Sequence, residues 1–164
     1  MQIGEKVDCF SWGGMDHIYP GLISIGSNVT ISTNVRILAH DAGLGYLTRS
    51  TRVGIVNIGN HCFIGAGTII LPNVRIGDWA IIGAGSVVTK DVPERTVYAG
   101  NPARYICSTD EYKNKHEQGL KNKAVSKKPW REWANATPDE WQDLRKRLEN
   151  DYGYITQRED ISEK

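Results

Sequence analysis

A histidine, His40, lies where a regular six-residue repeat in the sequence stops, in the stretch ILAHDAG. Imidazole changes its charge near pH 6.5, so a neutral histidine can accept a proton from an attacking hydroxyl group at neutral pH. General-base help of this kind accelerates a reaction by about 10²–10⁴-fold. Asp41 follows directly and is a candidate to orient the ring, although side chains that are adjacent in sequence often diverge. His40 is the predicted catalytic base.

The repeat on both sides of His40 has a period of six residues. Each block opens with an aliphatic residue, often followed by glycine, and has a small or branched residue at its fifth position. The opening residues are Ile25, Ile31 and Ile37 before the break and Ile58, Ile64, Ile70, Ile76, Ile82 and Val88 after it. A helix would repeat near 3.6 residues and a half-buried strand near 2. If each block is one short strand, three blocks complete one coil of a triangular prism, with the opening aliphatic residue pointing inward.

This pattern resembles the hexapeptide-repeat acyltransferases, and in particular the maltose and galactoside O-acetyltransferases and the O-acetyltransferases of bacterial polysaccharides. The resemblance implies a mainly β fold, a left-handed parallel β-helix. It divides the chain into an N-terminal segment (1–18), a β-helix domain (19–107) and a charged helical C-terminal appendage (108–164). Within the second part an excursion loop is expected at about 40–54.

The break in the repeat has a physical reason. In register, the block ILAHDA would place Asp41 inside the prism, where a lone carboxylate costs several kcal/mol. The chain is therefore expected to leave the prism at about His40, through the loop-like segment AGLGYLTRST. Because the coils bury their regular positions, function is expected on such excursions. In the families that the chain resembles, a histidine at the start of the loop is the catalytic base, and His40 matches it.

A second resemblance concerns the binding of the acyl donor. The segments IGAGSVVTKDVP and AGNPARYI resemble the coenzyme A segment of these families. Carried over by position, backbone groups of Ala66 and Ala84 lie along the pantetheine arm, and Thr89, Lys90 and Arg104 lie near the nucleotide. The implied co-substrate is acetyl-CoA. A further basic residue expected three positions after Arg104 in the sugar acetyltransferases is a cysteine here.

The candidates for binding the acceptor come from two segments. Trp12, Asp16 and His17 lie in SWGGMDHIYPG, before the first clear repeats, and Tyr46 lies on the excursion. An aromatic ring can stack on a sugar face, and a carboxylate can bind hydroxyl groups. The alternative for the N-terminal segment is a plain cap on the open end of the prism.

Composition excludes several classes of function. The net charge is +1, so nothing points to nucleic acid or to an anionic membrane. No apolar run approaches the length of a membrane span, and MQIGEKVDCF lacks a signal-peptide core. Three cysteines without paired spacing favour a reducing cytoplasm.

A metal site is not expected. A zinc enzyme of this fold needs three histidines that converge at one place. The chain has four histidines, His17, His40, His61 and His116, whose register does not bring three together.

The C-terminal appendage contains a well-marked helix in TPDEWQDLRKRLEN. Thr137 is a plausible N-cap and Glu140 completes a capping box. Trp141, Leu144 and Leu148 share one face, which is expected to pack on the prism or on a neighbouring subunit. The alternative role for this appendage is acceptor binding.

Together these features predict an acetyl-CoA-dependent O-acetyltransferase that acts on a saccharide hydroxyl in polysaccharide or glycoside assembly. The resemblance implies a homotrimer with each site between two chains. One alternative keeps the donor and changes the acceptor to an amino sugar on a nucleotide, which would be N-acetylated. An alternative of another class is a non-enzymatic scaffold.

Overall fold

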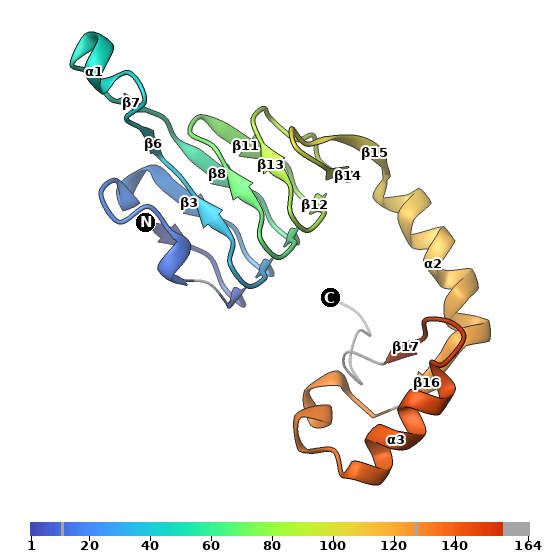
Figure 1. Cartoon of the computed structure of the whole chain (residues 1–164). Helices are drawn as coiled ribbons and strands as arrows, with labels where there is room; N and C mark the ends of the chain where they lie inside the picture. Colours follow the sequence, from blue (N-terminus) through green and yellow to red (C-terminus); the bar gives the residue numbers. More distant parts are fainter. Residues whose placement is uncertain (11, 127, 156–164) are drawn as a thin grey trace. The chain divides into compact units, whose positions relative to one another are not determined.

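The computed structural model describes residues 1–10, 12–126 and 128–155. The chain divides into two compact units, Met1–Tyr112 and Lys113–Lys164. The first unit is mainly β and the second contains most of the helical residues (Figure 1). The predicted mainly β fold with C-terminal helices is confirmed.

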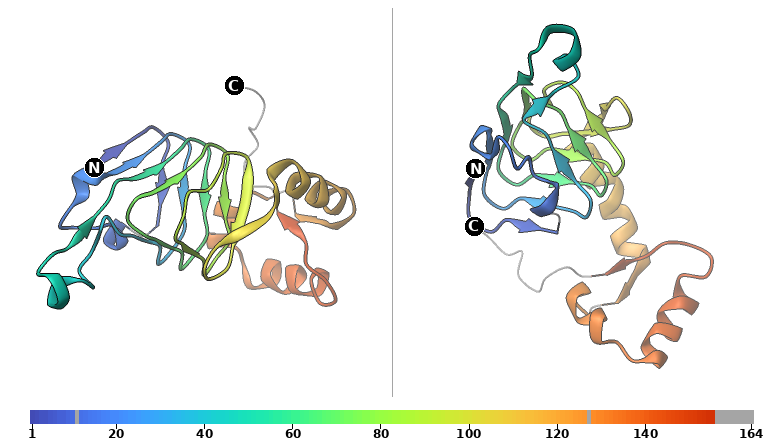
Figure 2. Two further views of the ribbon diagram at one scale, coloured as in Figure 1. Left: turned by 90° about the horizontal axis from the view of Figure 1, so that it is seen from above. Right: turned by 60° about the vertical axis from the view of Figure 1, so that its left-hand side comes forward.

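Three parallel sheets form three sides of a prism. The first side contains β1 (Gln2–Ile3), β3 (Ile23–Ile25), β8 (Val56–Ile58) and β11 (Val74–Ile76). The second contains β2 (Asp8–Cys9), β4 (Thr30–Ile31), β9 (Phe63–Ile64), β12 (Ile81–Ile82) and β14 (Thr96–Ala99), with β15 (Arg104–Ser108) antiparallel at its edge. The third contains β5 (Arg36–Ile37), β10 (Ile69–Ile70) and β13 (Val87–Val88). Successive strands visit the sides in turn, so the chain winds in stacked coils (Figure 2).

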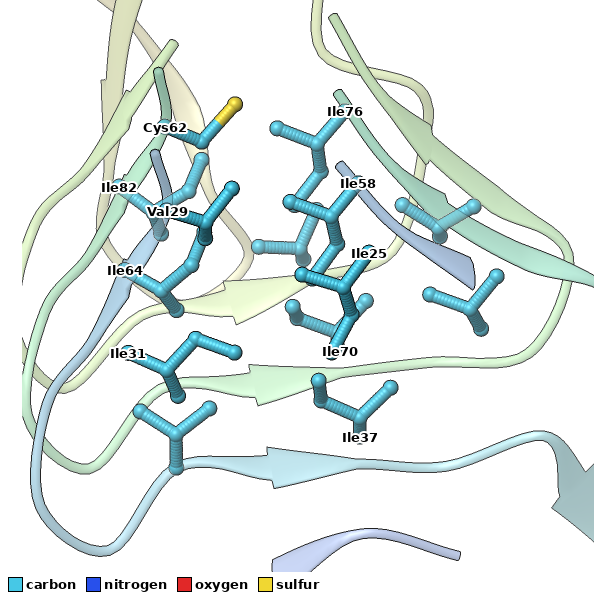
Figure 3. Packing of buried hydrophobic residues seen from close by; sticks show 14 of the residues in the cluster. Ile25, Val29, Ile31, Ile37, Ile58, Cys62, Ile64, Ile70, Ile76 and Ile82 are labelled. Carbon is cyan, nitrogen blue, oxygen red and sulfur yellow. The ribbon is translucent and has the colours of Figure 1, made fainter. Parts of the chain in front are cut away.

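The repeat positions account for the core. The opening aliphatic residues stack in columns inside the prism, as Ile25, Ile58 and Ile76 show in Figure 3. The small fifth-position residues are also buried, and Cys62 is one of them. Burial raises the pKa of the Cys62 thiol to about 11, so it remains protonated and serves as a small core residue.

The N-terminal segment 1–18 differs from its prediction, because it forms a coil of the prism itself. Gln2 pairs with Ser24, β2 pairs with β4, and Met15 forms a bridge with Ile37. The repeat is hard to see there because 22 residues separate Gln2 from Ser24, whereas 18 separate the paired Asn57 and Arg75 of later coils. The extra residues lie between Met15 and β3.

The excursion after His40 is a short hairpin. β6 (His40–Asp41) pairs antiparallel with β7 (Arg52–Val53), and α1 (Gly45–Thr48) lies at the tip (Figure 1). The backbone N–H of Gly54 donates to the carbonyl of Ala39 at 2.9 Å and closes the base. The hairpin leaves the prism between its third and first sides, at the same corner as the extra residues of the first coil.

The second unit begins within the long helix α2 (Thr109–Lys123), whose first residues belong to the first unit. It contains β16 (Ala124–Ser126) paired with β17 (Tyr154–Ile155), the 3-10 helix η3 (Trp130–Asn135) and α3 (Pro138–Arg147). The predicted capping box of α3 is confirmed, since the Thr137 hydroxyl accepts the Glu140 N–H and the Glu140 carboxylate accepts the Thr137 N–H at 2.7 Å. The packing of this unit on the prism stays a prediction.

Candidate active site

His40 lies at the base of the hairpin, with 24% of its side chain exposed. Backbone pairing of His40 with Val53 fixes its position on β6. Its Nδ1 atom is in hydrogen-bond contact with Oδ2 of Asp16, a residue of the first coil. The structure therefore brings together two of the predicted site residues that lie far apart in sequence.

Asp16 is a buried carboxylate that is fully held by the protein. Its Oδ1 accepts the N–H groups of Ile18 and Tyr19, each at 3.0 Å, and its Oδ2 accepts the N–H of Ala39 at 2.9 Å as well as the contact with His40. Burial alone would raise the pKa of Asp16, but the hydrogen bonds from Tyr19, His40, Ala39 and Ile18 outweigh it and hold that pKa well below its usual range. Asp16 is therefore ionised.

An ionised Asp16 determines which nitrogen of His40 carries the proton. A carboxylate can only accept hydrogen bonds, so Nδ1 of the neutral imidazole must be the donor. The lone pair then lies on Nε2, which can accept a proton from a substrate.

Asp41 does not occupy this position. Its Oδ2 pairs with Nη2 of Arg52 at 3.3 Å, its Oδ1 accepts the N–H of Gly43 at 2.9 Å, and half of its side chain is exposed. The orienting carboxylate of His40 is thus Asp16. Acceptor binding by Asp16 was also predicted from the sequence, but its buried contacts favour a positioning role.

Tyr19 is a neighbour of His40 that the sequence did not indicate. Its ring centroid lies 5.3 Å from that of His40, with the two planes tilted by 56°. Its backbone N–H also donates to Asp16. Tyr19 therefore limits the movement of the imidazole. The sequence could have indicated this residue, because it lies in the segment DHIYPG, which adds residues to the first coil.

The other predicted acceptor residues lie on exposed positions of separate segments. Trp12 begins the 3-10 helix η1 (Trp12–Gly14), with 47% of its surface exposed, and His17 is exposed beside the buried Asp16. Tyr46 is fully exposed in α1, at the tip of the hairpin. These three side chains are accessible, but the acceptor role assigned to them stays a prediction.

The predicted donor residues lie at two places on the prism. Ala66 and Ala84 occupy the same corner, between the second and third sides, one coil apart. The Gly85 N–H donates to the Ala66 carbonyl at 2.8 Å, and a Cβ on Gly65 would come within 2.5 Å of the Ala84 nitrogen, so the two coils approach very closely there. Ala84 is exposed at this corner and Ala66 is half-buried.

The predicted nucleotide-binding residues lie beyond the strand β13. Thr89 and Lys90 follow this strand directly and are exposed. The N–H of Ala103 donates to the carbonyl of Val87 at 2.8 Å, which holds the exposed Arg104 next to the same strand. The structure thus brings these basic residues to one end of the third side.

Two further findings concern the residues that the structure describes. Within this part of the chain, no group of three or more His, Cys, Asp or Glu side chains is arranged to hold a metal ion. None of the helices found there has the length and apolar character needed to cross a membrane.

Comparison with known proteins identifies the repeat. Residues 55–90 match the family described as bacterial transferase hexapeptide (six repeats). The chain carries the hexapeptide repeat of bacterial transferases. The predicted resemblance to hexapeptide-repeat acyltransferases is therefore confirmed.

Three similar proteins extend this result. One is YvoF of Bacillus subtilis (strain 168), which is provisionally named as an acetyltransferase. It is 40% identical over 111 residues, which are 68% of this chain and 62% of that protein. The hexapeptide-repeat-containing acetyltransferase from Vibrio cholerae O1 biovar eltor, solved with acetyl coenzyme A, has a TM-score of 0.58 and 30% identity, covering 65% of this chain and 58% of that one. A galactoside acetyltransferase in complex with coenzyme A has a TM-score of 0.55 and 31% identity, covering 68% and 56%. The chain thus spans about three fifths of the length of these relatives.

Asp16 should link the stability of the fold to pH. Its folded pKa lies below its unfolded value of about 3.9, so its ionised form stabilises the fold above that pH, and this contribution is lost as the pH falls below about 4. Urea unfolding should show Asp16→Asn less stable than the parent at pH 7, with the difference shrinking toward pH 3. A difference that stays constant over this range would contradict the ionised, hydrogen-bonded carboxylate. The exposed Asp41→Asn is the matched control and should change little.

Proposed function

We propose that this chain is an acetyl-CoA-dependent O-acetyltransferase that acetylates a hydroxyl group of a saccharide, with His40 as the general base. The observation that carries the proposal is the contact between His40 and the buried, ionised Asp16 at the base of the hairpin. The similar structures with acetyl-CoA or coenzyme A support the donor, and the galactoside acetyltransferase supports a saccharide acceptor. The same similarity supports a left-handed coil for the parallel β-helix.

The reaction would begin with proton removal. Nε2 of His40 accepts the proton of the acceptor hydroxyl while the oxygen forms a bond with the thioester carbon of acetyl-CoA. The carbon–sulfur bond then breaks, the imidazolium returns its proton to the departing thiolate, and the products are the acetyl ester and coenzyme A. A backbone N–H group of a neighbouring chain would stabilise the oxyanion.

Asp16 contributes through His40 and is a positioning residue. It keeps the proton on Nδ1 and lowers the energy of the imidazolium that forms during the transfer. Because the carboxylate is itself held by three backbone N–H groups, it does not need to reorganise during the reaction.

Substrate binding would use the exposed residues of the prism. Lys90 and Arg104 would pair with the phosphates of the donor, Thr89 would lie beside them, and backbone groups of Ala66 and Ala84 would follow the pantetheine arm. Trp12, His17 and Tyr46 would contact the acceptor. The setting that we propose is polysaccharide or glycoside assembly in the cytoplasm, with which three cysteines lacking paired spacing agree.

We propose a homotrimer in which each active site lies between two prisms. The flat sides of a prism suit closed cyclic packing, and the exposed apolar hairpin tip, with Leu47 81% exposed, offers a surface for a neighbouring chain. Light scattering should give a mass three times 18.3 kDa at micromolar concentration. A monomer that transfers acetyl groups would rule out the shared site.

Removal of the base should abolish most of the activity. His40→Ala should lower kcat for acetyl transfer by about 10²–10⁴-fold, because proton removal would pass to solvent. Folding and acetyl-CoA binding should survive, since His40 lies on the hairpin outside the core. His116→Ala is the control and should retain near-parent turnover, because His116 bonds to Tyr154 in the second unit. A correctly folded His40→Ala variant with parent turnover would exclude the general-base role.

Loss of the basic residues should weaken donor binding. Lys90→Ala and Arg104→Ala each remove a charge-assisted contact with phosphate, worth about 1.5–3 kcal/mol, so KM for acetyl-CoA should rise roughly 10–150-fold in each variant. KM for the acceptor should change little. Arg52→Ala, which removes a positive charge from the hairpin, is the control. Unchanged acetyl-CoA affinity in both variants would mean that the nucleotide binds elsewhere.

A further inference from the structure

The corner between the first and second sides carries a column of large turn residues. In successive coils this corner is formed by Lys6, Asn28, His61, Trp79 and Arg95, whose φ angles of 54°, 58°, 57°, 60° and 54° lie in the left-handed region. Glycine and asparagine adopt this region most readily, because a Cβ normally clashes there. Tryptophan at such a position is unusual and is not explained by the needs of the turn.

Trp79 forms an exposed aromatic platform at this corner. Its ring stacks on His61 with centroids 4.1 Å apart and planes 8° from parallel, and the Arg95 guanidinium lies 5.8 Å from its centroid. Even so, 47% of Trp79 is exposed. The His61 ring covers one face of the indole and the Arg95 guanidinium approaches it from the next coil, so the ring is fixed in place with part of its surface exposed.

A polar groove on the first side leads up to this platform. The hollow has a volume of about 480 Å³ and crosses four coils. Its floor contains rows of glycine, and its polar side chains come from the outward positions Gln2, Ser24, Asn57, Asn60, Arg75 and Asp78. Asn60 and Asp78 directly precede His61 and Trp79, so the groove ends at the aromatic corner.

The other end of the groove lies toward the candidate active site. The hairpin that carries His40 returns to the prism at Gly54, and β8, which contributes Asn57 to the groove, begins two residues later. The first side therefore spans from the corner of His40 to the corner of Trp79, along the direction of β8.

The chemistry of the groove suits a neutral saccharide. Its polar side chains are amides, a hydroxyl and one charge of each sign, Arg75 and Asp78, and this balance favours neither a polyanion nor a polycation. Ser24 donates to Gln2 and Asn60 donates to Asp78, so these side chains are held in place by one another. The core of a subunit interface would be more apolar. Apolar side chains instead face outward on other sides, as Phe63 and Ile81 do on the second and Ile69 and Val87 on the third.

We propose that this groove binds a chain of sugar residues, with the exposed part of Trp79 in contact with a ring remote from the one that reacts at His40. The proposal rests on the proposed function for its acceptor end. It makes the first side an extended binding surface for a polymeric acceptor, so that affinity grows with the length of the saccharide.

Binding can be measured without turnover, which separates this proposal from the transferase proposal. Maltose and maltohexaose, and the di- and hexasaccharides of N-acetylglucosamine, are titrated calorimetrically into the full chain without acetyl-CoA. At least one hexasaccharide should bind about tenfold more tightly than its disaccharide. Trp79→Asn, which suits the left-handed turn and should fold, should remove this preference and leave disaccharide binding and acetyl-CoA binding unchanged. Asn57→Ala should reduce it in part.

The matched control is Trp141→Ala, because Trp141 is also 47% exposed but belongs to α3 of the second unit. It should keep the preference for hexasaccharides. The proposal is overturned if neither sugar series shows a length preference, if Trp79→Asn retains it, or if hydrogen exchange shows the first side covered by another copy of the chain. A length preference that depends on Trp79 would support the groove even if the chain transferred no acetyl group.

Discussion

The structure depends on the close stacking of successive coils through parallel backbone ladders. Neighbouring strands in such a ladder lie about 4.8 Å apart, and the interior accepts only aliphatic and small side chains in register. At several positions the coils leave no room even for a Cβ, since one on Gly77 would lie 2.4 Å from the nitrogen of Glu94 and one on Gly65 would lie 2.5 Å from that of Ala84. Additional residues therefore cannot be accommodated within a side and must leave at a corner.

This constraint also builds the candidate active site. The first coil and the second coil both release their extra residues at the corner between the third and first sides. The Asp16 N–H donates to the Ile37 carbonyl at 2.9 Å, which places the start of one excursion directly against the other. Because the two excursions start side by side, the side chain of Asp16 contacts His40 directly. A rigid ladder thus fixes the geometry of residues that themselves lie outside the repeat.

Much of the fold followed from the sequence because its signals are local. The six-residue period gave the buried columns of isoleucine, and the Thr137–Glu140 capping box gave the start of α3. The position of His40 at the break was also evident. The partner of His40 was not, because the first coil is longer than the later ones and its register was hidden. Asp41 was the nearest carboxylate in sequence, but adjacent residues of β6 point to opposite faces.

The platform at Trp79 was hidden for a different reason. The repeat predicts which positions point inward, but it does not restrict the outward side chains at a corner. The stack of His61 on Trp79 is therefore visible only when the coils are aligned.

The buried carboxylate links stability and chemistry at the candidate site. A charge as deeply buried as Asp16 is tolerated because three backbone N–H groups donate to it, with the His40 ring as a further partner. Those N–H groups come from the start of both excursions, so Asp16 links the two departing segments and also contacts the imidazole. The position of the Asp16 carboxylate is therefore fixed relative to the His40 ring. The site is preorganised because its orienting residue is part of the framework that ends the repeat.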